Sequence, residues 1–202
     1  MSHSLESVLG SIDTFANDSD LEKLRFLASA VVPYGVVENV EGVPELFQCL
    51  KKQGFTKDAV DLMRQMLSKA GFRSDHVSLL DEHKEADFKK LPVMLFRENI
   101  ISVADELGNR KYLRALVNII PEDEIGVARD RIKSAIQLFQ HLLHKHTISA
   151  DNHENLVKWL QEIGRNDILR KWFHLGIAVQ EQGLPHFDEY IIAECINRDL
   201  FL

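Results

Sequence analysis

The sequence is poor in cysteine, which cross-links small folds through disulfides, and in proline, which interrupts helices. Of its 202 residues only two are cysteine and five are proline, and the two cysteines, Cys49 and Cys195, lie far apart. A disulfide framework would need more cysteines, so we expect both thiols to be reduced and the protein to be cytoplasmic. The first residues also lack the basic and apolar regions of a signal peptide, which agrees with that expectation.

Positive charge and long apolar runs are scarce as well. Lys and Arg together number 24 against 31 Asp and Glu, which gives a net charge of −7. Because no basic stripe is present to neutralise phosphates, the sequence argues against nucleic acid as a partner. The apolar runs, such as residues 28–33, are too short to span a bilayer, so we expect no insertion into membranes.

The short motifs that carry chemistry are missing. The sequence contains no Walker-type glycine loop, no GxGxxG and no QACxG-like setting for a nucleophilic cysteine. Its histidines are not accompanied by cysteines or carboxylates at the spacing of a tetrahedral metal site. We therefore predict no catalytic residue, no cofactor and no metal, and we expect that the protein is not an enzyme.

What the sequence has is helical periodicity, with apolar residues at steps of three and four. The predicted helices of the first half are 4–16, 21–32, 44–53, 58–70 and 74–82, with a poorly periodic stretch at 34–42. Those of the second half are 94–107, 110–120, 122–131, 133–146, 150–163 and 166–175. The charged stretch 81–87 has almost no apolar residues and is typical of a linker. The predicted organisation is a first domain at 1–82, a linker at 83–91, a second domain at 92–178 and a tail at 179–202, for which one additional helix stays open as an alternative.

The two halves repeat each other. Leu-Phe-Gln occurs at 46–48 and again at 138–140, and Arg-x-Asp occurs at 73–75 and again at 165–167. The interval between the two motifs is the same in both halves, since 73 − 46 and 165 − 138 both equal 27. The economical interpretation is two copies of one unit of about 80 residues.

These repeated segments resemble a known family. The stretch AIQLFQHL at 135–142, with Asp-Asn at 151–152 and residues 156–169, resembles helices four to six of initiator-caspase prodomains. The stretch DSDLEKLRFL at 18–27 resembles their second helix. Each half is thus similar to a death effector domain, and together they cover about residues 4–175. The resemblance implies an all-α fold of two six-helix death-fold bundles in tandem, as in initiator-caspase prodomains and FLIP-type inhibitors.

The resemblance also implies a function. It suggests a non-enzymatic adaptor or regulator of apoptotic, death-receptor-type signalling that modulates recruitment of an initiator caspase. The implied partners are proteins with death effector domains or death domains, such as an adaptor or an initiator caspase, together with assembly into a homo-oligomer or filament. Two alternatives stay open. Residues 105–113 and 124–125 also resemble the start of a death domain, which would give an adaptor with one domain of each kind. The second alternative is that the chain is the prodomain fragment of an initiator caspase.

An aromatic side chain on the predicted second helix is a candidate partner anchor. On a helical wheel, Leu21, Leu24 and Ala28 form the core stripe, whereas Phe26 falls almost opposite and Leu27 lies at the edge. We therefore expect Phe26 to be exposed, and burying it in a partner would contribute ~2–3 kcal/mol. The Phe-Leu pair that binds partners in the resembled family falls on these two residues.

A charged triad is the second candidate. The resemblance matches the family's helix-two acid with Asp20 and its Arg-x-Asp motif with Arg73 and Asp75. One interpretation is an exposed salt bridge worth at most ~1 kcal/mol to stability. The other is a polar network that orients a docking surface, and the two are compatible.

The second half keeps only part of this pattern. Arg165 and Asp167 match the motif, but Asn109 takes the position of the acid, and Leu116 matches the leucine of the Phe-Leu pair without an aromatic before it. The second domain is thus expected to have an incomplete triad and no aromatic anchor. Its candidate binding residues are Leu116, Arg165 and Asp167, and the two domains are expected not to be interchangeable.

Overall fold

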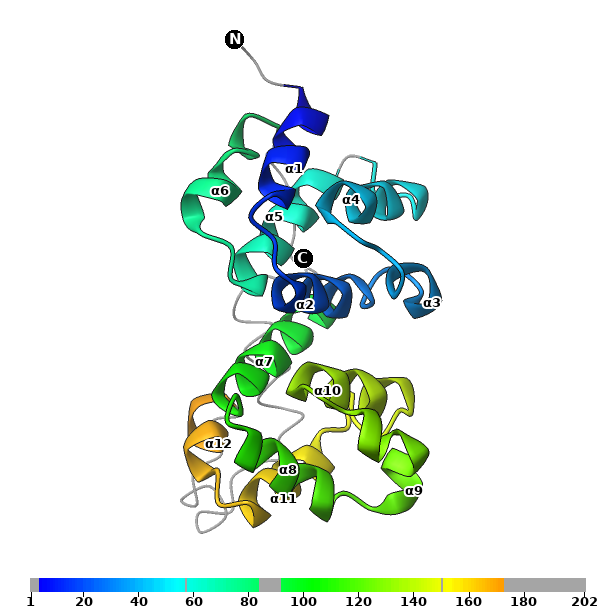
Figure 1. Cartoon of the computed structure of the whole chain (residues 1–202), viewed down its shortest axis with the longest axis vertical. Helices are drawn as coiled ribbons and strands as arrows, with labels where there is room; N and C mark the ends of the chain where they lie inside the picture. Colours follow the sequence, from blue (N-terminus) through cyan, green and yellow to red (C-terminus); the bar gives the residue numbers. More distant parts are fainter. Residues whose placement is uncertain (1–3, 57, 84–91, 150, 173–202) are drawn as a thin grey trace. The chain divides into compact units, whose positions relative to one another are not determined.

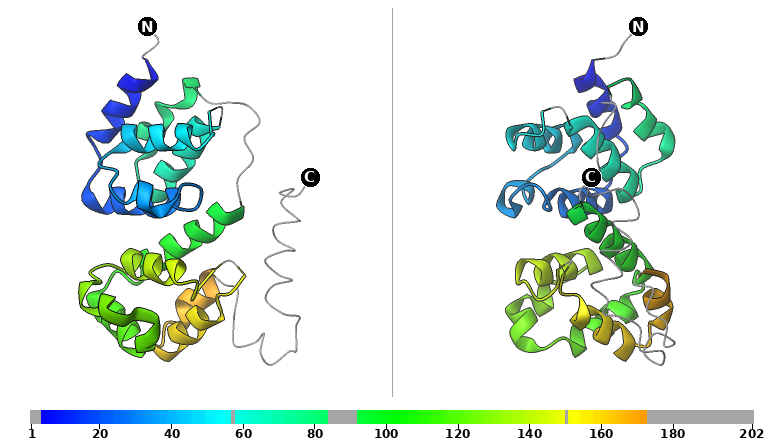
Figure 2. Two further views of the ribbon diagram at one scale, coloured as in Figure 1. Left: turned by 90° about the vertical axis from the view of Figure 1, so that its right-hand side faces the viewer. Right: turned by 180° about the vertical axis from the view of Figure 1, so that it is seen from behind.

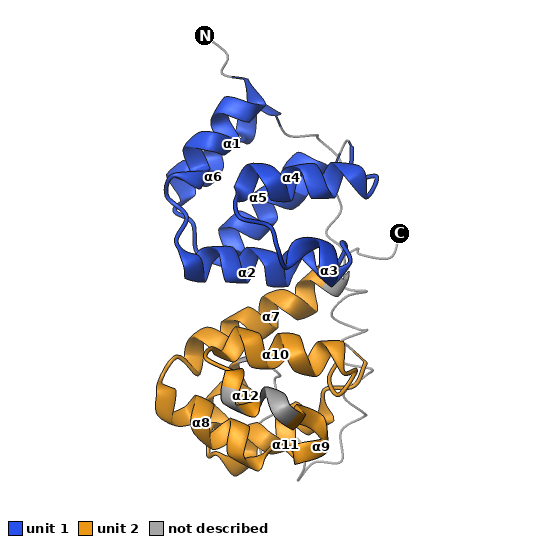
Figure 3. Ribbon diagram, turned by 45° about the vertical axis from the view of Figure 1, so that its right-hand side comes forward, with its two compact units in different colours: residues 1–90 blue, residues 91–202 orange. Residues whose placement is uncertain are grey.

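The protein is all-α throughout the part of the chain that the structure describes (Figure 1). The computed structural model describes residues 4–56, 58–83, 92–149 and 151–172. The chain divides into two compact units, residues 1–90 and 91–202 (Figure 3). This division falls in the predicted linker, whose residues 84–91 lie outside the described residues, as does the predicted tail. No described helix offers the apolar length that crossing a membrane would require.

Unit 1 contains six described α-helices that surround one apolar core. They are α1 (Leu5–Asp13), α2 (Asp18–Ala28), α3 (Tyr34–Val37), α4 (Val43–Lys52), α5 (Ala59–Ala70) and α6 (Ser74–Ser78), followed by the 3-10 helix η1 (Asp81–His83). Helix α1 packs on α4, α2 on both α4 and α5, α3 on α4, and α5 on α4 and α6. The core is built from fully buried side chains that include Leu9, Ile12, Leu46, Met63 and Met66. The amphipathic stripes predicted from the sequence therefore face one another.

Unit 2 is helical as well (Figure 2), and its six described α-helices follow in the same order. They are α7 (Pro92–Glu106), α8 (Arg110–Ile119), α9 (Glu122–Ile125), α10 (Ala135–His144), α11 (Glu154–Glu162) and α12 (Asn166–Trp172), with the 3-10 helix η2 (Gly126–Arg131) between α9 and α10. Helix α7 packs on α10, α8 on α11, α9 on α10 and α11 on α12. Each of these pairs corresponds to a contacting pair of unit 1, and α7 also packs on α12.

The residues that precede the helices correspond between the units at a constant spacing. The pairs are Asn17 and Asn109 before the second helix, Gly42 and Ser134 before the fourth, and Arg73 and Arg165 before the sixth. The differences 109 − 17, 134 − 42 and 165 − 73 all equal 92. Both asparagines cap their helices, since Asn17 Oδ1 accepts a hydrogen bond from the Asp20 amide and Asn109 Oδ1 accepts one from the Lys111 amide. We refer to this spacing as the 92-residue offset.

The region around the third helix is where the units depart from this offset. Pro33 precedes α3 and Pro121 precedes α9, and 121 − 33 is only 88. The stretch from Pro121 to Ser134 is correspondingly longer than the one from Pro33 to Gly42, 13 residues against 9. The longer stretch carries η2. Unit 2 therefore has an additional wall of backbone beside its second helix.

Candidate protein-binding surfaces

The predicted aromatic anchor, Phe26, is in the core. Its side chain is only 1% exposed and Leu27 is fully buried, so the prediction that Phe26 faces solvent is wrong. The wheel assumed that α2 has one buried side, but α2 packs against both α4 and α5. Four of the last five residues of the helix, Leu24 and 26–28, are buried as a result. Neither Phe26 nor Leu27 is placed to contact a partner without unfolding the helix.

Leu116 of unit 2 is also a core residue. It is fully buried on α8, so it is not on the surface on which partner binding was predicted. The 92-residue offset matches Leu116 with Leu24 rather than with Leu27. The sequence alignment of the second helices was therefore wrong by three residues. The same error placed Asn109 at the acid position, whereas it is the helix cap.

The predicted triad of unit 1 is reduced to a pair. Arg73 Nη2 lies 2.9 Å from Asp75 Oδ2, and the Arg73 side chain is 77% exposed. Arg73 precedes α6 in an extended conformation, which is why it reaches an acid only two residues away. Asp20 does not join them, because its carboxylate accepts a hydrogen bond from the Asn17 amide and completes the capping box of α2.

An exposed aromatic does lie beside this pair, but it is Phe15. The Phe15 side chain is 54% exposed and stacks on His76 of α6, with ring centroids 3.9 Å apart. Leu79, which follows α6, is also exposed. We call the group formed by the exposed residues Phe15, Arg73, Asp75 and Leu79, together with the partly buried His76, the α6 surface.

Sequence reasoning missed Phe15 because the first helix was extended to residue 16. The helix ends at Asp13, so Phe15 lies in the turn before α2 rather than on a helical face. The available signal was the turn sequence itself, in which an aromatic is followed by Asn17 and Asp18, the residues that begin the next helix.

In unit 2 the matching arginine is the centre of a polar network. Arg165 donates two hydrogen bonds to Asp167, from Nε at 2.9 Å and from Nη2 at 2.7 Å, and a third from Nη1 to the Glu106 carbonyl oxygen at 2.8 Å. Its guanidinium lies over the Tyr112 ring, 4.6 Å from the centroid. The Arg165 side chain is only 10% exposed, and Lys171 of α12 pairs with the Glu106 carboxylate.

This network joins three helices and changes the protonation of its acid. Arg165 precedes α12, Glu106 ends α7 and Tyr112 is on α8. The hydrogen bonds from Arg165 lower the pKa of Asp167 to about 2. The second helix of unit 2 supplies no acid to this group, and Glu106 of α7 and Tyr112 of α8 instead supply contacts that the motif does not contain. Tyr112 occupies the position of Asp20 in the 92-residue offset.

Neither surface has the arrangement of a reaction centre. In the described ranges no group of three or more His, Cys, Asp or Glu is placed to hold a metal ion. Cys49 is buried in α4, and burial raises the pKa of its thiol, which disfavours the reactive thiolate. What these arrangements offer chemically is charge, aromatic surface and hydrogen bonding to another molecule.

Comparison with models of protein families, with curated proteins and with solved structures found no match for this chain. The repeated helix order, the α6 surface and the Arg165 network are the observations from which a function can be argued.

Proposed function

We propose that the chain is a non-enzymatic adaptor or regulator of death-receptor-type signalling in the cytoplasm, built from two death effector domains in tandem. One observation carries the proposal. Both units place six α-helices in the same order, share four corresponding pairs of packed helices, and have before the sixth helix an arginine paired to an aspartate two residues on. This is the pattern that the sequence resemblance implies for each unit.

The constant offset supports two units of the same kind. The caps of the second, fourth and sixth helices all differ by 92 residues, including the cap of α8, which lies in the segment that resembles a death domain. A different domain in the second half would have no reason to keep these intervals. The tandem of death effector domains is therefore preferred over an adaptor with one domain of each kind.

The α6 surface is the proposed docking surface of unit 1. Arg73 has no buried partner and keeps most of its side chain in water, so a carboxylate on another protein can replace or join Asp75. Phe15 and Leu79 add exposed apolar area beside it, and burying an aromatic of this size in a partner contributes ~2–3 kcal/mol. Aromatic and arginine side chains of this type dominate protein interfaces.

Capture of isolated domains tests the proposed function. The full chain is immobilised and presented with isolated death effector domains of an adaptor and of an initiator caspase, and with isolated death domains. We expect selective capture of death effector domains. Capture of death domains alone, or of neither kind, would contradict the proposal.

Two variants locate the contact. Phe15→Ser and Arg73→Glu change exposed side chains, so we expect each to weaken capture about tenfold or more while the melting temperature stays nearly unchanged. The matched control is Arg170→Glu, which makes the same charge change at an exposed position of α12. Equal weakening by the control would show that net charge, and not the α6 surface, governs capture.

A further inference from the structure

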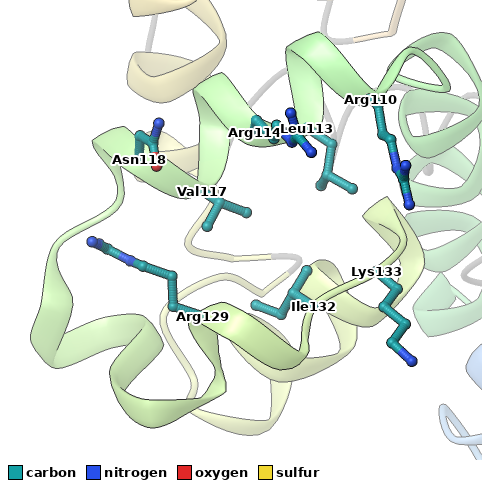
Figure 4. Close-up of a pocket in the computed structure, with 8 residues that line it drawn as sticks. All are labelled: Arg110, Leu113, Arg114, Val117, Asn118, Arg129, Ile132 and Lys133. Carbon is teal, nitrogen blue, oxygen red and sulfur yellow. The ribbon is translucent and has the colours of Figure 1, made fainter.

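Unit 2 has a pocket lined by basic residues beside its second helix. The pocket has a volume of about 500 Å³ and lies between α8 and the segment that runs from η2 to the start of α10 (Figure 4). Val117 of α8 and Ile132 of the opposite wall face each other across it (Figure 4). The cationic residues of its lining are Arg110, Arg114, Arg129 and Lys133, and no acid is among the lining residues whose side chains the structure describes.

These four cations are not neutralised within the described part of the chain. None of them is in an ion pair there, and Arg129 donates only from Nη2 to the Ile120 carbonyl oxygen, at 3.0 Å. The Nε of Arg129 is buried without a hydrogen-bond partner. Arg110 and Arg114 are one turn apart on α8, a like-charge spacing that costs a helix a few tenths of a kcal/mol. Such a cluster, in a chain of net charge −7, indicates that an anionic group occupies the pocket in use.

The matching positions of unit 1 carry the opposite charge. By the 92-residue offset, Arg110 corresponds to Asp18, Arg114 to Glu22 and Lys133 to Glu41. Asp18 and Glu41 are exposed. We call Asp18, Glu22 and Glu41 the acidic face of unit 1.

A longer side chain occupies the corresponding place in unit 1. Arg25 corresponds to Val117, and its Nε donates to the Val40 carbonyl oxygen at 2.7 Å, so its longer side chain bridges α2 and the segment before α4. This bridge holds Glu41 next to the helix that carries Asp18 and Glu22. The Arg25 hydrogen bond therefore braces the acidic face of unit 1, whereas the corresponding place in unit 2 is the basic pocket.

We propose that the basic pocket of unit 2 receives the acidic face of unit 1 from a second copy of this chain. The match of three acids with three cations at corresponding positions is the evidence for this occupant. Because the two surfaces are on different units, the contact is heterologous and can recur from one copy to the next. The inference rests on the proposed function, in which the units are docking modules, and names the surface through which copies join.

Sedimentation equilibrium of the full chain over a concentration series tests the proposal. We expect self-association that weakens about tenfold or more when salt is raised from about 50 mM to about 500 mM. Arg110→Glu with Lys133→Glu reverses two of the four cations of the pocket, and Asp18→Lys with Glu41→Lys reverses two of the three acids of the acidic face. Each double variant alone is expected to lose association about tenfold or more, because each puts like charges opposite each other at two of the three matched positions.

Mixing the two double variants tests directly whether the two surfaces contact each other. In the mixture every contact can again join opposite charges, so we expect association to return to near the wild-type level. The matched control, Lys158→Glu with Arg170→Glu, makes the same change in net charge on α11 and α12 and should associate like wild type. Failure of the mixture to recover, with both variants folded by circular dichroism, would overturn the proposal.

Other outcomes separate this proposal from the proposed function. A wild-type chain that stays monomeric yet captures death effector domains overturns the second-copy contact and leaves the proposed function in place. Recovery of association in the mixture, without any capture of death effector domains, supports the contact and removes the proposed function. Binding of tripolyphosphate to a monomeric chain, lost in Arg110→Glu with Lys133→Glu, would assign the pocket to a small polyanion instead.

Discussion

The Arg-x-Asp motif occurs twice in this molecule and has two different environments. In unit 1, Arg73 and Asp75 form an exposed pair. In unit 2, Arg165 and Asp167 form the same pair, but Glu106 and Tyr112 enclose the arginine. The motif therefore fixes the local pairing, because the arginine precedes the helix in both units. The neighbouring helices decide whether the arginine stabilises its own unit or remains available to a partner.

The second helices differ in a similar way. Helix α2 places Phe26 in the core, whereas α8 has the exposed Asn118 at the corresponding position, 118 − 26 being 92. Helix α2 carries acids where α8 carries arginines. One fold thus accommodates opposite surfaces, because only the apolar positions that face the core must be kept.

Replacing Phe26 should give the largest effect. Phe26→Ala removes a fully buried ring, and we expect it to destabilise unit 1 by about 3–5 kcal/mol, whereas Asn118→Ala should change stability by less than about 0.5 kcal/mol. Both tryptophans, at positions 159 and 172, belong to unit 2. Urea unfolding followed by circular dichroism should therefore shift in Phe26→Ala, while the tryptophan fluorescence transition stays in place. An unshifted dichroism transition would mean that Phe26 is not packed in the core.

Replacing the arginines of the two Arg-x-Asp motifs should give the second-largest difference in stability between the units. Arg165→Ala breaks three hydrogen bonds of a mostly buried guanidinium, and we expect a loss of about 2–3 kcal/mol in the tryptophan-monitored transition. Arg73→Ala removes an exposed pair and should cost at most about 1 kcal/mol. Arg165→Lys is the matched control, since it keeps the charge but loses the planar fork. Equal costs for the two alanine variants would contradict the difference in burial.

Asp167, the acid paired with Arg165, should make the stability of unit 2 depend on pH. The pKa of Asp167 is about 2 in the folded protein, below the value of about 3.9 for an unfolded aspartate. A lowered folded pKa stabilises the protein above the unfolded value, and this contribution is lost as the pH falls through about 2. The stability difference between wild type and Asp167→Asn should therefore be constant above about pH 5 and shrink between about pH 4 and pH 2. Urea titrations at a series of acid pH values measure it, and a difference that persists unchanged to pH 2 would exclude this ionisation as its source.

A backbone position gives the smallest expected effect. The turn after α4 has Gly54 at φ 99°, and the corresponding residue after α10 is His146 at φ 58°, a left-handed conformation that favours glycine. We expect His146→Gly to stabilise unit 2 by on the order of 0.5 kcal/mol and Gly54→Ala to destabilise unit 1 by about 1 kcal/mol. Thermal unfolding detects both, and shifts of the same sign would refute the equivalence of the two turns.

Much of the fold could be predicted from the sequence. Helical periodicity and the cap residues located every long helix to within a few residues. The 27-residue interval between the two motifs, found in both halves, already indicated that one unit occurs twice. The short helix α3 was missed because four residues after Pro33 are too few to show a period. Helix periodicity also does not reveal how many neighbours a helix packs against, which is why Phe26 was placed in solvent.

The candidate site was predicted less well, for reasons that concern single residues. The pairing of each arginine with its aspartate follows from the motif, but the contacts of Arg165 with Glu106 and Tyr112 depend on how α7 and α8 pack against the start of α12. The basic pocket requires the longer stretch that carries η2, together with the correct alignment of α8 with α2. Once Asn109 is recognised as a cap rather than as a substitute for Asp20, the charge reversal can be found in the sequence itself.

The most direct test of the proposed function is size-exclusion chromatography with light scattering, on the full chain alone and with an isolated death effector domain. The proposed function predicts that the partner changes the mass of the species, either by joining a larger assembly or by being held in a small defined complex. It also predicts that Arg73→Glu prevents the change and Arg170→Glu does not. A mass profile equal to the sum of the two separate proteins would contradict the claim that this chain works through contacts between death effector domains.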